Sequence, residues 1–340
     1  MLADDRNSAI ALTLAVLAAV QFISSSNFIQ HNLNSNMTVQ NTKCPNCQSS
    51  ELINKGKLFD SDYFSGIKQN NRINGGELIE CEACRLAFRN PIIQPEDILT
   101  LYQNGLDSLY LTEPSKRKDW IIASRWIEQF VPENGSLLDV GCFDGSFLKT
   151  LLGKYDKYGI EIHSAAVQSA QNNNITILCS DLNELQGISK KFDCITLIDV
   201  IEHVKNPAAV LNDCLAKLNK NGILIVTTGN YDSWQFKLMA PNYWYCNIEH
   251  IVFIGERWLK KFFLVKNEIK NTKLIKFSHR DRGLASTAID ILKNIFYICS
   301  PNLFYRTKNL LRDRKNKIDL PDSPPDWKTA KDHIAIFMQI

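Results

Sequence analysis

Four cysteines near the start of the chain have the spacing of two metal-binding knuckles. Cys44 and Cys47 bound "CPNC", Cys81 and Cys84 bound "CEAC", and 33 residues separate the two pairs. Four thiolates at this spacing can surround one tetrahedral Zn²⁺. Because four protein ligands leave no position for water or substrate, we expect this zinc to be structural.

A glycine turn supplies a second set of candidate residues. The stretch "LLDVGCFDGSFL" (137–148) is typical of a buried strand, a tight turn and the start of a helix. Ligands of open α/β sheets bind beyond the carboxyl ends of strands, where the helix N-terminus offers free N–H groups. Gly141 lets a ligand approach the backbone, and Gly145 lets the helix pack on the strand. Glu161 ends the next strand, where its carboxylate can accept both hydrogen bonds of a ribose diol.

Phe143 stands where dinucleotide-binding turns carry their central glycine. A pyrophosphate needs the close approach that this glycine allows, whereas a ligand without phosphate tolerates a side chain there. The turn therefore argues against a nicotinamide cofactor. Asp139, Asp181 and Asp199 recur at the carboxyl ends of consecutive strands. Any one of them could simply cap a helix or turn, but the set indicates one ligand site.

From Leu137 onward, strand-like and helix-like segments alternate, which predicts a mainly parallel sheet with helices on both faces. This is an α/β, Rossmann-like fold of seven strands with a small N-terminal zinc module. A helical insertion precedes the last strand. The expected strands are 136–141, 157–162, 175–181, 192–200, 222–230, 271–279 and 333–340, and the expected helices are 145–152, 164–171, 207–218 and 255–263.

These patterns divide the chain into five parts. We expect a leader, a zinc-binding module, a helical connector, the main domain in two pieces, and an insertion or lid. The corresponding residues are 1–36, 37–90, 91–135, 136–279 with 327–340, and 280–326. Met37 is an alternative start, because "MTVQNTKCPNC" leads directly into the first knuckle.

The ordered motifs resemble those of the class I S-adenosylmethionine-dependent methyltransferases. Their first motif, hhDxGxGxG, is matched by "LLDVGCFDG" except at Phe143. The block "FDCITLIDVIEHVKNPAAVLNDCLAKLNKNGILIVTTGN" is similar to the subgroup that includes ubiquinone-biosynthesis and small-molecule or sugar methyltransferases. The resemblance covers about residues 118–265. "CEACRLAFRNPIIQPEDILTLYQ" also resembles the zinc module fused to bacterial sugar and glycan-modifying methyltransferases.

This resemblance implies S-adenosylmethionine as cofactor. It assigns the ribose-binding acid to Glu161 and the adenine-side acid to Asp181. The positions that match the family's cofactor site are Asp139, Gly141, Cys142, Phe143, Asp144, Gly145, Glu161, Ile162, Asp181, Leu182, Asp199 and Val200.

Two histidines could take a proton from a hydroxyl acceptor during methyl transfer. His250 is the first candidate, because it follows the fifth expected strand and the aromatic residues 243–245, which could wall an acceptor pocket. His203, in "DVIEHV", is the second candidate and could instead only shape the pocket. Glu202, Glu249 and the two histidines could alternatively coordinate a divalent cation.

The insertion combines an apolar segment with a basic one. "AIDILKNIFYICSPNLF" is followed by "YRTKNLLRDRKNK". A solvated basic helix is one interpretation. The other is an acceptor lid, or a surface that contacts an anionic membrane through residues 291–317.

Composition limits the remaining choices. A net charge of +3 over 340 residues is too small to indicate a nucleic-acid partner. Ten cysteines, in two knuckles and in apolar runs, favour a reducing compartment, so we expect a cytoplasmic protein. The apolar run 9–23 is shorter than the roughly 20 residues of a membrane span, although it could associate with a membrane.

We therefore predict an S-adenosylmethionine-dependent methyltransferase with a structural zinc, acting on a hydroxyl of a small molecule, sugar or glycan precursor. A nicotinamide-dependent oxidoreductase is the alternative enzyme. A non-catalytic zinc-ribbon binding protein is the alternative from another class. The sequence leaves open the acceptor, the oligomeric state, and methylation at oxygen rather than carbon or nitrogen.

Overall fold

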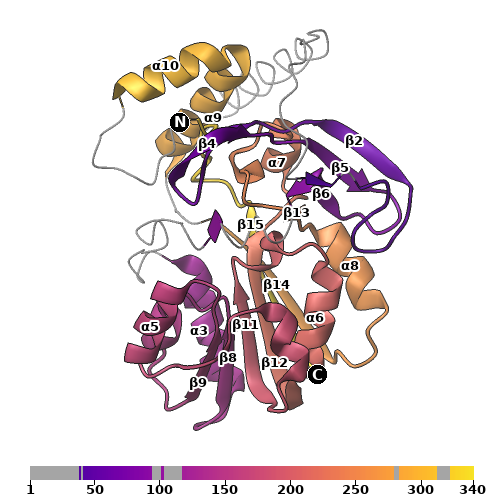
Figure 1. The fold of residues 1–340 in the computed structure, drawn as a ribbon, viewed down its shortest axis with the longest axis vertical. Helices are drawn as coiled ribbons and strands as arrows, with labels where there is room; N and C mark the ends of the chain where they lie inside the picture. Colours follow the sequence, from indigo (N-terminus) through magenta and orange to yellow (C-terminus); the bar gives the residue numbers. More distant parts are fainter. Residues whose placement is uncertain (1–37, 40, 94–100, 103–116, 279–282, 312–321) are drawn as a thin grey trace, which may run out of the picture.

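A seven-stranded sheet organises the second half of the chain in the computed structural model, which describes residues 38–39, 41–93, 101–102, 117–278, 283–311 and 322–340 (Figure 1). The first five strands along the sheet are parallel, and β15 is antiparallel to both of its neighbours. In sheet order the strands are β10 (Thr176–Cys179), β9 (Asp156–Ile160), β8 (Ser136–Val140), β11 (Phe192–Ile198), β12 (Leu218–Gly229), β15 (His333–Gln339) and β14 (Asn271–Phe277). This confirms the predicted mainly parallel, Rossmann-like fold.

The central strands are buried because helices cover both faces of the sheet. All five residues of β8 are buried, as the continuous apolar run predicts. The helices and short 3-10 turns around the sheet are α3 (Lys118–Phe130), α4 (Ser146–Thr150), α5 (Ser164–Asn172), η4 (Leu182–Gly187), η5 (Ile201–His203), α6 (Pro207–Ala216) and α8 (Glu256–Leu264).

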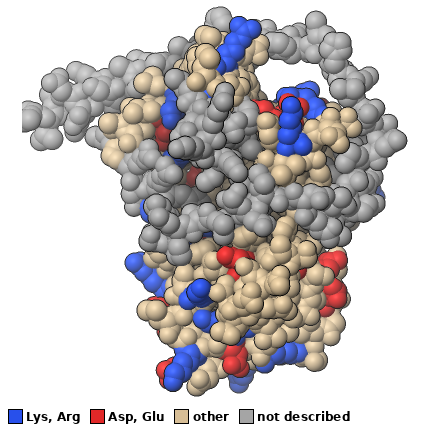
Figure 2. Space-filling view, turned by 60° about the vertical axis from the view of Figure 1, so that its left-hand side comes forward, with Lys and Arg blue, Asp and Glu red and all other residues tan. Residues whose placement is uncertain are grey.

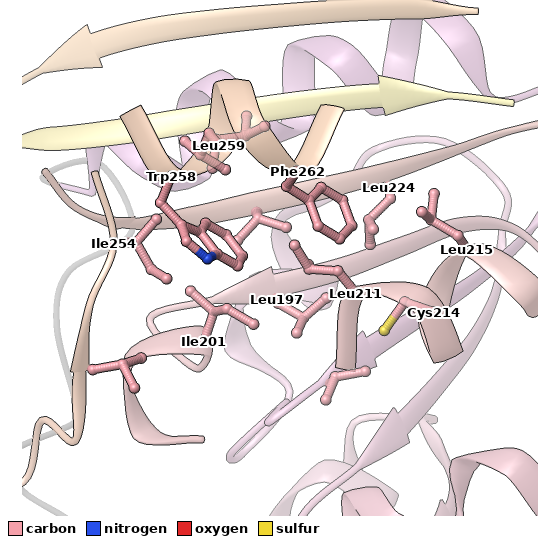
Figure 3. Close-up of a cluster of buried hydrophobic side chains, with 14 of the residues drawn as sticks. Leu197, Ile201, Leu211, Cys214, Leu215, Leu224, Ile254, Trp258, Leu259 and Phe262 are labelled. Carbon is pink, nitrogen blue, oxygen red and sulfur yellow. The ribbon is translucent and has the colours of Figure 1, made fainter. Parts of the chain in front are cut away.

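Each face has its own core. On one face, α6 and α8 pack against β11 and β12, with Trp258 stacked on Phe262 at 5.6 Å between ring centroids (Figure 3). On the other face, Trp126 and Phe130 of α3 lie against Phe337 of β15. The last strand is therefore held in the sheet by apolar contacts as well as by its ladder hydrogen bonds.

The cysteine-containing part of the chain forms small sheets that share a strand with the main domain. β2 (Leu52–Lys57), β5 (Glu77–Cys81) and β6 (Ala87–Asn90) are joined by β13 (Val252–Phe253), which comes from the main domain. Two further strand pairs are β3 (Ser61–Phe64) with β4 (Ile67–Ile73), and β1 (Thr38–Val39) with β7 (Ile92–Ile93). We call residues 41–93 the cysteine module.

The insertion before the last strand contains the helical hairpin α9 (Leu284–Cys299) and α10 (Pro301–Leu311). It lies at the end of the molecule that holds the cysteine module, beyond the carboxyl ends of the parallel strands (Figure 1). Its buried residues pack with α7 (Trp234–Met239) and the segment that includes η6 (Trp244–Cys246). The predicted leader, 1–36, and part of the predicted membrane-contact segment, 312–317, lie outside the described residues. Among the described helices, none has the length and apolar character needed to cross a membrane.

Candidate functional site

The glycine turn between β8 and α4 leaves no room for side chains at its two glycines. Gly141 has φ +73°, and a Cβ there would lie 2.6 Å from Cγ2 of Val200. Gly145 has φ +77°, and a Cβ there would lie 2.0 Å from Cδ1 of Ile175. Phe143, between the two glycines, also has a positive φ, 46°. The backbone therefore turns tightly at Phe143 although this residue carries a side chain. The turn thus has the geometry that the sequence predicts.

Glu161 lies next to this turn at the end of β9 and is buried. Its Oε2 accepts a hydrogen bond from the Phe143 N–H at 2.8 Å, and its Oε1 accepts one from the His163 N–H at 2.7 Å. Each carboxylate oxygen has a second lone pair, so the group can still accept from two hydroxyls. Burial raises the pKa of Glu161, and the two N–H donors oppose that shift. This pair of acceptor oxygens fits a ribose diol, whose two hydroxyls can donate to it.

The remaining predicted cofactor positions have different surroundings. The Asp139 carboxylate accepts from Thr196 Oγ1 at 2.6 Å and ties β8 to β11, and burial raises its pKa to about 7. Asp144 bonds the N–H and hydroxyl of Ser146, where α4 begins. Cys142 is buried, Ile162 is exposed beside Glu161, Leu182 and Val200 are half-buried, and Asp181 is exposed and caps η4.

Asp199 follows β11 with φ 54°, an uncommon conformation for a residue other than glycine. The Arg117 guanidinium bonds Asp199 Oδ2 at 2.7 Å and also pairs with the buried Asp119 at the start of α3. Backbone strain of this kind is concentrated at functional sites. Sequence reasoning did not find Arg117, because a single basic residue before a helix has no distinguishing pattern.

The two predicted catalytic histidines lie side by side near the carboxyl ends of β11 and β12. Their ring centroids are 4.9 Å apart. His250 Nδ1 lies 2.7 Å from the Tyr245 carbonyl oxygen, and His203 Nδ1 lies 3.0 Å from that of Glu249. Since a carbonyl can only accept, Nδ1 of His250 carries the hydrogen and its Nε2 keeps a lone pair. Nδ1 of His203 also lies 2.7 Å from the Tyr102 hydroxyl, which can donate to it as well as accept from it. Burial lowers the pKa of both imidazoles, which favours the neutral form.

Glu202 completes this histidine cluster. Ligand atoms of Glu202, His203 and His250 all lie within 4.8 Å of one another. The buried Glu202 carboxylate accepts from the Tyr245 hydroxyl at 2.5 Å and from the Thr228 hydroxyl at 3.0 Å. Burial raises the pKa of Glu202 to about 7, and the charge of a nearby aspartate adds to the shift. We call Glu202, His203 and His250 the histidine cluster.

Arg89, from β6 of the cysteine module, holds the loop that carries His250. Arg89 is 1% exposed. It donates to the carbonyls of Cys246 at 3.0 Å, Asn247 at 2.6 Å and His250 at 3.2 Å, and also to that of Gly75. Burial lowers the pKa of Arg89 to about 10, so the group stays charged at neutral pH.

Another buried pair lies next to this loop and was not predicted. His333 Nδ1 is 2.8 Å from Asp332 Oδ1, and the Tyr243 hydroxyl bonds the other oxygen of the same carboxylate. The acidic surroundings outweigh burial and raise the pKa of His333. In the sequence His333 is only the first residue of an apolar strand, so nothing there distinguishes it from a core histidine.

The four knuckle cysteines meet in the cysteine module. Sγ of Cys44 lies 3.6 Å from Sγ of Cys84, and Sγ of Cys47 lies 3.6 Å from Sγ of Cys81. All four sulfur atoms lie within 4.8 Å of one another. A regular tetrahedron with Zn–S bonds of about 2.3 Å has S···S separations of about 3.8 Å, so this donor set fits zinc.

Comparison with known proteins agrees with this geometry. Residues 118–264 match a family model described as a methyltransferase domain. This part of the chain is similar to methyltransferase domains. It includes the glycine turn, Glu161 and His203, whereas His250 lies close to its end and the cysteine module lies outside it.

The relatives are distant and match only in part. Over 130 residues the chain is 28% identical to the ubiquinone biosynthesis O-methyltransferase of Coxiella burnetii, covering 35% of this chain and 55% of the relative. Over 183 residues it is 24% identical to the tRNA U34 carboxymethyltransferase of Campylobacter jejuni, covering 47% and 63%. The chain thus spans little more than half the length of the first of these relatives. A solved S-adenosylmethionine-dependent methyltransferase from Archaeoglobus fulgidus is similar with a TM-score of 0.41 and 15% identity, covering 73% of this chain and 100% of that one.

Replacing Arg89 tests how strongly the cysteine module and the main domain depend on each other. Arg89→Met keeps an apolar stem but leaves four carbonyl groups without their donor. Since an unpaired buried acceptor costs about 1–3 kcal/mol, we expect the free energy of unfolding in urea to fall by at least about 3 kcal/mol. Arg72→Met is the control, because Arg72 is exposed and its surface ion pairs contribute about 0–1 kcal/mol. Equal losses of unfolding free energy in Arg89→Met and Arg72→Met would contradict this role for Arg89.

Proposed function

We propose that this protein is an S-adenosylmethionine-dependent methyltransferase that methylates a hydroxyl group of a small molecule, sugar or glycan precursor. The observation that carries the proposal is the Glu161 carboxylate, fixed by two backbone N–H groups beside the glycine turn of a methyltransferase domain. The relative from Coxiella burnetii, whose name gives an O-methyltransferase, supports methylation at oxygen.

The cofactor site would be formed by the glycine turn and the acids at the strand ends. Glu161 would accept the ribose hydroxyls, and Asp181 with the exposed Ile162 would lie on the adenine side. Phe143 would be tolerated because this ligand has no pyrophosphate. When bound, the sulfonium supplies an electrophilic methyl group.

The histidine cluster would act on the acceptor. We assign the general base to Nε2 of His250. Burial lowers the pKa of this imidazole, and its Nδ1–H donates to the Tyr245 carbonyl. This Nε2 would take the proton of the acceptor hydroxyl as that oxygen bonds to the methyl carbon. His203 is the second candidate, and its contact with the Tyr102 hydroxyl at 2.7 Å favours a role in shaping the pocket.

A second mechanism uses the same cluster to hold a divalent cation. The observation that favours it is that the Nδ1–H of His250 donates to a carbonyl, as in metal-bound histidines, while ligand atoms of Glu202, His203 and His250 lie within 4.8 Å of one another. In that case the histidines would bind the cation and would not accept the proton of the acceptor hydroxyl. Measuring turnover after divalent cations are removed with a chelator distinguishes the two mechanisms.

We further propose that Cys44, Cys47, Cys81 and Cys84 bind a structural Zn²⁺. With four thiolate ligands the metal would stabilise the fold of the module and take no part in the reaction. This proposal supports a reducing, cytoplasmic location, because thiolates that bind zinc are reduced. The six other cysteines also form no disulfide among the described residues.

A net charge of only +3 over 340 residues favours a small-molecule acceptor over RNA. On the face shown in Figure 2, the lower part of the molecule is mostly tan, with separate blue and red groups scattered over it. Proteins that bind nucleic acid gather Lys and Arg on one face. The tRNA relative from Campylobacter jejuni therefore does not guide our choice of acceptor.

Glu161→Ala is expected to weaken binding of S-adenosylhomocysteine in calorimetry by about 1–3 kcal/mol, because the ribose loses its acceptor. Glu128→Ala is the matched control, since Glu128 is an exposed carboxylate on α3. Wild-type protein that binds NADH and not S-adenosylhomocysteine would refute the cofactor assignment.

His250→Ala is expected to lower turnover by about 10²–10⁴-fold and to leave the affinity for S-adenosylhomocysteine unchanged, because the base acts only on the acceptor. His203→Ala should have the smaller effect on turnover.

The acceptor is found first, by adding methyl-labelled cofactor and the protein to extracts of a deletion strain. Turnover that vanishes with chelator and returns with a divalent cation would assign the cluster to the metal. Wild-type turnover in both variants would leave the histidines a structural role.

Cys81→Ser is expected to abolish zinc binding and destabilise the cysteine module. Elemental analysis of wild-type protein purified under reducing conditions should give one zinc per chain. Cys299→Ser is the control, since Cys299 is exposed on α9 and should leave the zinc content unchanged. Disulfides between the two knuckles in place of metal would overturn the assignment.

A further inference from the structure

Apolar side chains are exposed along the helical hairpin α9–α10. In α9, Ile289 is 52% and Leu292 61% exposed, and in α10, Leu303 is 49% and Leu310 84% exposed. Ile289 and Leu292 are three residues apart and Leu303 and Leu310 seven apart, so each pair shares one side of its helix. Four large apolar side chains in two adjacent helices are more than the isolated examples that most protein surfaces carry.

The opposite side of the hairpin fixes it to the rest of the protein. The buried Asp290 accepts from the N–H and the hydroxyl of Thr329, each at 3.1 Å. Tyr297 and Phe304 are buried in the cluster that includes Trp327 and α7. The exposed apolar residues therefore take no part in holding the hairpin in place.

Charges on the exposed side of the hairpin are positive. Lys293 lies next to Leu292, and Arg306 lies between Leu303 and Leu310, each on an exposed part of its helix. The only acid in either helix is Asp290, which is buried and paired with Thr329. Apolar residues flanked by cations are typical of a surface that enters the headgroup region of an anionic bilayer.

We propose that the α9–α10 hairpin docks the protein on membranes that contain anionic lipids. Ile289, Leu292, Leu303 and Leu310 enter the boundary between headgroups and acyl chains, and Lys293 and Arg306 contact lipid phosphates. A second copy of the chain on this surface would bring like charges together. The apolar residues 9–23 of the chain carry no acid that could pair with the two cations.

Docking would hold the site at the bilayer. The hairpin lies at the same end of the molecule as the cysteine module and the carboxyl ends of the parallel strands (Figure 1). An acceptor carried by a lipid would therefore be presented on the side where the histidine cluster lies. The docking itself does not depend on the proposed reaction.

Sedimentation of the full chain with vesicles tests the proposal. We expect binding to vesicles of phosphatidylglycerol mixed with phosphatidylcholine at physiological salt, and much weaker binding to phosphatidylcholine alone. Leu292→Ser with Leu310→Ser should reduce the partition coefficient at least about tenfold, since each leucine loses most of its burial in the bilayer. Lys293→Gln with Arg306→Gln should reduce it by about fivefold for each cation removed.

Leu264→Ser is the matched control, because Leu264 is 82% exposed on α8 and lies outside the hairpin. It should leave vesicle binding unchanged, and all variants should keep the wild-type circular dichroism spectrum, since the replaced residues are exposed.

A failure of the wild-type protein to bind anionic vesicles would overturn the proposal. The proposal would also be overturned if vesicle binding persisted in the double leucine variant and in the double cation variant but was lost when residues 1–36 were deleted. A dimer in light scattering that the leucine variants dissociate, without vesicle binding, would assign the surface to a second copy.

Discussion

The geometry of the site depends on one buried cation. A guanidinium cannot lose its proton at neutral pH, so once buried it must find acceptors for its donors. Arg89 finds four of them in backbone carbonyls, three of which belong to residues 246–250. Hydrogen bonds to Arg89 fix the direction of these carbonyl groups. They thereby also fix the loop that carries His250. The position of a proposed catalytic side chain is therefore set by a residue more than 150 positions earlier in the chain.

This contact makes the cysteine module part of the site. Arg89 lies in β6, which pairs with β5, the strand that ends at Cys81, and also with β13 of the main domain. A second contact joins the two parts, since the Ser65 N–H donates to the Glu249 carboxylate at 2.9 Å. The four cysteines are thus connected to the histidines through a short sheet and these hydrogen bonds. A metal that is purely structural can in this way influence a reaction in which it takes no part.

Local patterns predicted the sheet well and the site in part. Continuous apolar runs identified the strands, because strands buried on both faces have no polar side to interrupt them. Gly141 and Gly145 could be proposed because the turn itself fixes their spacing along the chain, and Glu161 because it follows the next strand. Arg89, β13 and the Asp332–His333 pair were not found, because each depends on a contact between residues far apart in sequence. His203 and His250 were each placed near a strand end, but their 4.9 Å separation comes from the folded loop and from no pattern in the sequence.

The position of β15 bears on how the chain folds during synthesis. β15 lies between β12 and β14, although it follows both of them and the helical hairpin along the chain. As the polypeptide leaves the ribosome, β12 and β14 are both translated before the strand that separates them. Until His333–Gln339 emerges, the edge of β12 has unpaired N–H and C=O groups, which are a template for pairing with other chains. The main sheet is therefore completed only after the insertion has been made, and until then the nascent protein exposes this edge of β12.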